Sequence, residues 1–138
     1  MAQLFEFIGN HPLAVGLFAA LLALFIRNET RRGGDSVSAQ QLVDLVNREN
    51  AVVVDVRDAN EFKSGHVVDA VNVPFASLEG RLGELEPYRA RPIVIADKMG
   101  QHGNAAGMVL RKNGFEQVSR LTGGMMEWTN QNLPLVKS

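Results

Sequence analysis

Residues 91–115 constrain the fold more than any other part of the sequence, because they join a strand, a glycine-containing loop and a helix. Residues 93–95 are an unbroken β-branched apolar run, which is typical of a parallel strand buried on both faces. Small and apolar residues recur with helical spacing further on, and Gly114 lies where that helix would end. The stretch therefore predicts one strand–loop–helix unit of an α/β fold.

The loop of this unit is the expected functional site. Its two glycines allow the backbone N–H groups to converge with the amino end of the next helix on one point, where an anion would sit. The candidate ligand-binding residues are Asp97, Lys98, Met99, Gly100, Gln101, His102 and Gly103.

This stretch resembles the active loop of the rhodanese homology family, which is Cys-x-x-Gly-x-Arg-Ser followed by an alanine-rich helix ending in Gly-Phe. The family's catalytic cysteine falls on Asp97, and its Arg-Ser pair falls on His102 and Gly103. The resemblance implies a rhodanese-like parallel sheet with helices on both faces. The matching positions are Gly100, Ala106, Leu110, Gly114 and Phe115.

The family's chemistry depends on a group that this chain lacks. A rhodanese thiolate attacks the outer sulfur of thiosulfate or a similar donor and carries it as a persulfide. The chain contains no cysteine, and a carboxylate cannot hold sulfane sulfur. The phosphatases of this fold need the same thiolate. We therefore expect no catalytic residue and no cofactor, while an enzyme of the sulfurtransferase or phosphatase type that uses another group remains the alternative.

Asp97 has three other interpretations. A metal site with His102, and with His66 or His11, has no ligand spacing behind it, so none is predicted. An aspartyl nucleophile would need further carboxylates for magnesium. The favoured interpretation is that the Asp97 carboxylate itself accepts the N–H bonds that an anion would otherwise take.

A second stretch, residues 52–74, resembles the family's Asp-x-Arg, Glu-Phe, Gly-His-Ile and Asn-Ile-Pro elements in order and spacing. Asp55, Arg57, Glu61 and His66 could do acid–base chemistry. The resemblance implies instead that they pair and cap around the turn after the strand. We expect a structural role for all four. The resemblance covers about residues 36–136.

The amino-terminal region is predominantly apolar over residues 4–26. At 1.5 Å per residue the uninterrupted part is shorter than a hydrocarbon core of about 30 Å, so a spanning helix must include residues 4–8. We expect a transmembrane anchor within residues 1–27, a basic and glycine-containing linker over 28–35, and the rhodanese-like domain over 36–138. A cleavable signal peptide is the alternative, but the run has no basic residue before it and a poor cleavage site.

Basic and small residues of the amino-terminal region predict the localisation and the partners of this protein. The basic flank Arg27, Arg31 and Arg32 predicts a single-pass protein of the bacterial inner membrane with its carboxyl-terminal domain in the cytoplasm. Gly16 and Ala20 could form a shallow face for a partner helix, or simply meet lipid. The net charge of −1 gives no sign of nucleic-acid binding. We expect membrane lipid and a membrane or cytoplasmic protein as partners, and a protein-interaction function.

The remaining elements are predicted from caps and periodicity. Ser38 and Gln41 indicate a capping box for a helix that ends near Asn50. Strands are expected over residues 51–56, 71–73 and 117–121, a short helix over 77–85, and a final helix after a Gly123–Gly124 turn.

Overall fold

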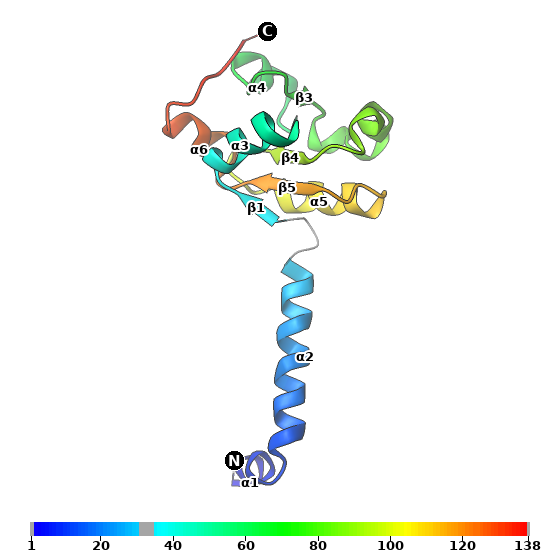
Figure 1. Ribbon diagram of the computed structural model, residues 1–138, viewed down its shortest axis with the longest axis vertical. Helices are drawn as coiled ribbons and strands as arrows, with labels where there is room; N and C mark the ends of the chain where they lie inside the picture. The colour runs from blue at the N-terminus through cyan, green and yellow to red at the C-terminus, as the bar shows by residue number, and fades with distance from the viewer. Residues whose placement is uncertain (1, 31–34, 138) are drawn as a thin grey trace. The chain divides into compact units, whose positions relative to one another are not determined.

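The structure is a computed structural model that describes residues 2–30 and 35–137 (Figure 1). The chain divides into two compact units, Met1–Arg31 and Arg32–Ser138. The predicted linker residues 31–34, which include two arginines of the basic flank, lie outside the described residues.

The amino-terminal unit has two helices where the sequence predicted one over residues 4–26. Helix α1 spans Ala2–Asn10 and helix α2 spans Pro12–Thr30. The prediction of one continuous helix was wrong because Pro12 has no backbone N–H and its ring would clash with the preceding turn, whereas proline suits the first position of a new helix. In residues 2–30 and 35–137, no helix is both long enough and apolar enough to cross a membrane.

The second unit is built on a parallel sheet, as predicted. Its strands in the described part of the chain are β1 (Asp35–Val37), β2 (Val52–Asp55), β3 (Val71–Asn72), β4 (Ile93–Ala96) and β5 (Val118–Leu121). They lie in the order β1-β5-β4-β2-β3, with all neighbours parallel. Strand β1 was not predicted: Asp35, which the sequence assigned to the linker, pairs with Ser119 of β5.

Helices connect the strands. They are α3 (Ala39–Glu49), α4 (Ala59–Ser64), η1 (Phe75–Ser77), η2 (Glu79–Tyr88), α5 (Gly103–Lys112) and α6 (Gly124–Asn130). The capping box of α3 is confirmed, because Ser38 and Gln41 exchange backbone-to-side-chain hydrogen bonds of 2.8 and 3.1 Å. The helix expected over residues 77–85 is instead a pair of 3₁₀ helices, η1 and η2. The two glycines and one proline of η2 disfavour a regular α-helix.

The two faces of the sheet bury separate apolar clusters, since successive side chains of a strand point to opposite faces. Val52 and Val54 pack with α5 and η2, including Leu110 and Leu85. Val53 lies on the other face, in the cluster formed with α3 and α6. The sheet is therefore a central layer with helices on both sides. Because the strands are parallel, the loops that follow them all begin at the same, carboxyl-terminal end of the sheet.

The tail after α6 closes the domain. The indole N–H of Trp128 donates to the Pro134 carbonyl at 3.0 Å. His66 and Val136 exchange two backbone hydrogen bonds of 2.9 Å as an isolated antiparallel bridge. The tail thus joins α6 to the segment that follows α4.

Candidate functional site

The loop between β4 and α5 wraps around the Asp97 carboxylate. Oδ1 accepts a hydrogen bond from the Gly100 N–H at 2.6 Å, and Oδ2 accepts from the N–H groups of His102 and Gly103 at 2.6 and 2.9 Å. Asp97 is only 2% exposed. These contacts confirm the prediction that the carboxylate fills the ring of amides. The three N–H groups therefore already donate to a group of the chain itself.

The first turn of α6 is hydrogen-bonded to the backbone of this loop. The N–H groups of Met125 and Met126 donate to the carbonyls of Asp97 and Lys98 at 2.7 and 2.9 Å. Gly124 has φ +61°, and a Cβ added there would lie 2.5 Å from the Asp97 carbonyl oxygen. Only glycine fits so close to the loop backbone. The sequence predicted the glycine turn but not its contact with the loop.

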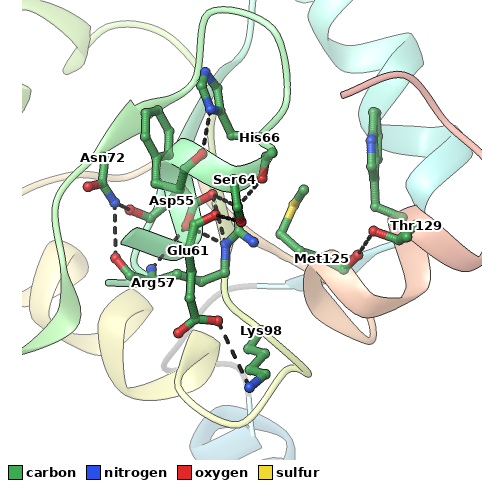
Figure 2. A network of polar contacts seen from close by, with 12 residues as sticks. Asp55, Arg57, Glu61, Ser64, His66, Asn72, Lys98, Met125 and Thr129 are labelled. Carbon is green, nitrogen blue, oxygen red and sulfur yellow. Dashed lines mark hydrogen bonds and ion pairs between the residues drawn. The ribbon is translucent and has the colours of Figure 1, made fainter. Parts of the chain in front are cut away.

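The turn after β2 is held by an ion pair (Figure 2). Arg57 Nη2 lies 2.7 Å from Asp55 Oδ2, and its Nε donates to Asp55 Oδ1 at 3.0 Å. The same Nη2 donates to the Gly65 carbonyl at 2.7 Å. Asn72 donates to the carbonyls of Asp55 and Arg57, both at 3.0 Å. The ion pair and these carbonyl contacts hold the turn, which is the role expected of Asp55 and Arg57.

His66 is engaged away from the loop. Its Nδ1 lies 2.7 Å from the Phe62 carbonyl oxygen, and its ring stacks on the Phe62 ring with centroids 3.7 Å apart. It is 6% exposed. The side chain therefore belongs to the packing between α4 and the tail.

A pocket of about 230 Å³ lies beside the loop. The loop contributes Asp97, Lys98, Gln101 and His102 to its lining. The other lining residues, from β2, α4 and η1 with their flanks, are Val56, Arg57, Asp58, Glu61, Phe75 and Ala76. Of the predicted site residues, Met99, Gly100, Gly103, Asp55 and His66 do not line it.

Sequence reasoning missed four of the lining residues, Val56, Asp58, Ala76 and Phe75. Phe75 contacts the loop directly. Its ring stacks on that of His102, with centroids 4.9 Å apart and an interplanar angle of 15°. The only local signal was an aromatic residue directly after Pro74. The pairing joins residues 27 positions apart in the chain, and no periodicity reveals such a contact.

The described residues hold no group of three or more histidine, aspartate or glutamate side chains placed to bind a metal ion. At the pocket itself, several ionisable side chains pair with another side chain or accept backbone N–H groups. Lys98 Nζ, for example, lies 4.0 Å from Glu61 Oε2 (Figure 2).

A parallel sheet whose central strand opens into an amide-ringed loop and a helix defines the class of this protein. Residues 38–131 match the family described as Rhodanese-like domain. The chain belongs to the rhodanese-like domain family, as its motifs predicted. The matched residues include the loop and α6, and they exclude α1 and α2.

Individual relatives cover different parts of the chain. It is 31% identical over 142 residues to Uncharacterized protein YibN of Escherichia coli (strain K12), covering 99% of each chain. It is 31% identical over 96 residues to Thiosulfate sulfurtransferase GlpE of Shewanella oneidensis, covering 70% of this chain and 93% of that protein. The first similarity therefore extends over the amino-terminal helices.

Solved structures share the fold of the second unit. The rhodanese-related protein from Thermoplasma volcanium superimposes with a TM-score of 0.68 at 24% identity, covering 75% of this chain and 99% of that one. The Rhodanese-like domain from an Anabaena sp. protein gives 0.66 at 26% identity, covering 75% and 79%.

Proposed function

We propose that this protein is a membrane-associated rhodanese-like protein that transfers no sulfur and serves as a protein-interaction module. The observation that supports this most is the Asp97 carboxylate, which occupies the family's cysteine position and takes three backbone N–H groups for itself. A thiolate there would point its charge at a donor molecule, whereas this carboxylate is turned inward and almost fully buried.

The absence of cysteine from the sequence supports the same proposal. Persulfide formation needs a sulfur nucleophile, and no other residue in the loop supplies one. What remains is a loop held by hydrogen bonds with a pocket beside it, and such a surface suits recognition of another molecule. We infer that the partner is a protein.

The amino-terminal helices support association with a membrane. Large apolar side chains are exposed along α1 and α2: Leu4, Phe5, Leu13, Leu17, Phe18, Leu21, Leu22, Leu24, Phe25 and Ile26. A continuous exposed apolar surface of this kind marks a membrane or protein contact. We propose that lipid covers most of it, with Gly16 and Ala20 as the contact for a partner helix.

We place the protein at the bacterial inner membrane with the rhodanese-like domain in the cytoplasm. The basic residues Arg27, Arg31 and Arg32 suit the anionic lipid of the cytoplasmic leaflet. Protease added to intact spheroplasts should leave the domain whole and should digest it only after lysis. Digestion without lysis would reject the orientation.

The interaction function is tested by site-specific photocrosslinking in living cells. A photoreactive amino acid at Lys98, which is exposed on the loop, should yield one discrete adduct with an identifiable protein. The matched position is Met108, exposed on α5, where no such adduct is expected. In parallel, the full-length chain should transfer no sulfur from thiosulfate to cyanide above background. Robust transfer, or equal adducts from both positions, would overturn the proposal.

A further inference from the structure

The loop pocket offers an incoming anion few free donors. The N–H groups of Gly100, His102 and Gly103 all donate to Asp97. Arg57, the guanidinium that lines the pocket, is bound to Asp55 and to the Gly65 carbonyl. Lys98, the ammonium at the rim, lies 4.0 Å from Glu61. Of the groups that could recognise a phosphate, sulfate or carboxylate, the three loop amides and the Arg57 guanidinium therefore already have partners.

The acidic groups of the pocket exceed its basic groups. Its lining includes the three carboxylates of Asp58, Glu61 and Asp97, against the two cations of Arg57 and Lys98, and Asp55 pairs with Arg57 from behind. Asp58 is exposed at the start of α4 and its side chain makes no capping hydrogen bond. A negative charge entering the pocket would meet this surplus, and a positive charge would reduce it.

The shape of the pocket suits one long side chain. Val56, Ala76 and Phe75 supply apolar surface, and the Phe75 ring is fixed by its stacking on His102. Apolar and aromatic walls can cover the methylene stem of an arginine or lysine while carboxylates at the rim bind its charged head. A charge-assisted hydrogen bond to a carboxylate is the strongest contact available there.

We propose that this pocket receives a cationic side chain, arginine or lysine, of the partner protein. The inference rests on the proposed function and names the partner's chemistry at that site. The carboxylate at position 97 thus reverses the ligand preference of the loop: it occupies the anion-binding amides and leaves a pocket that favours cations.

The test uses the full-length chain in detergent and N-acetyl-arginine methylamide as the probe. The matched control is the citrulline analogue, which has the same shape without the charge. The arginine probe should shift the amide NMR signals of the loop saturably, and the citrulline analogue should bind about tenfold more weakly, because the charge-assisted hydrogen bond is lost. Equal binding of the two probes, or tighter binding of N-acetyl-glutamate methylamide, would overturn the inference.

Variants separate the pocket from general charge effects. Asp58→Asn combined with Glu61→Gln should weaken the arginine probe by about tenfold or more. Asp44→Asn, on the exposed side of α3, lowers the negative charge without touching the pocket and should change nothing. Asp97→Gly should release the amides, so that sulfate binds and the arginine probe weakens. If the double variant binds the arginine probe as the unaltered chain does, the pocket is not its site.

The outcomes also separate this inference from the proposed function. A loop adduct in cells together with equal binding of the arginine and citrulline probes would retain the interaction module and reject the cationic ligand. Selective arginine binding without any adduct would retain the pocket's preference and reject the module.

Discussion

Replacing Asp97 by alanine tests whether the carboxylate stabilises the loop. The change removes three hydrogen bonds of 2.6, 2.6 and 2.9 Å from a side chain that is 2% exposed. Hydrogen bonds to a charged group contribute about 1.5 kcal/mol or more each, so the gross loss is about 4.5 kcal/mol. Two effects offset it: a buried charge no longer has to be desolvated, and water from the adjoining pocket can reach the freed N–H groups. We expect a net loss of about 1 to 3 kcal/mol.

The assay is urea unfolding of the full-length chain followed by tryptophan fluorescence. Trp128 is the only tryptophan of the sequence and is 4% exposed in α6, so the signal reports on the rhodanese-like domain alone. For a domain of about 100 residues, each kcal/mol corresponds to roughly 4 to 8 °C in Tm. Asp58→Ala is the matched control, since that side chain is exposed and makes no capping hydrogen bond. It should stay within about 0.5 kcal/mol.

Asp97→Asn sharpens the same test. The amide keeps the shape of the carboxylate but turns an NH₂ group toward backbone donors, so it should destabilise the domain at least as much as alanine does. A neutral Asp97→Ala, or an asparagine variant as stable as the unaltered chain, would refute the reasoning that the carboxylate holds the loop.

Three further outcomes follow from the structure. Asp97→Cys should give a reactive thiolate, because the same N–H groups and the amino end of α5 favour the charged form. Iodoacetamide should therefore modify it rapidly at neutral pH, and slow modification would count against this. Gly124→Ala should cost about 2 kcal/mol or more in unfolding free energy, since φ is +61° and the added Cβ would meet the Asp97 carbonyl; a wild-type urea midpoint would contradict it. Hydrogen bonds from Arg81 and Arg89 lower the pKa of Glu84 and Glu86 in the folded state. Their small contribution to stability should therefore be present near neutral pH, fall as the pH drops through the glutamate range toward about 4, and weaken in high salt. Glu84→Gln with Glu86→Gln should remove that part of the pH dependence, and an unchanged stability–pH curve would show that the pairs contribute nothing.

The central unit of the fold could be predicted because its signals are local. The β-branched run of residues 93–95, the two loop glycines and the helix stop at Gly114 each act within a few positions of the chain. The same loop glycines led to the prediction that Asp97 would meet the amides. The hydrogen bonds are short-range in sequence, three to six residues apart, so spacing was sufficient.

The missed features depend on contacts between distant residues or on single backbone effects. Strand β1 has three residues, two of them polar, and it forms because its backbone pairs with that of β5. The wall formed by Phe75 and His102 depends on the packing of η1 against the loop. At the amino end, apolarity suggested one helix, while the steric effect of Pro12 on the turn before it decided otherwise.

The pairing of β1 with β5 also sets the order of events during synthesis. Asp35 and Ser119 are neighbours in the sheet, so the ribosome must make nearly the whole domain before β1 can pair with β5. Such a non-local pairing is slow to form, because a long loop has to close first. Residues 2–30 leave the ribosome well before that moment. The membrane contact proposed for them would therefore form while the domain is still a nascent chain, before it folds.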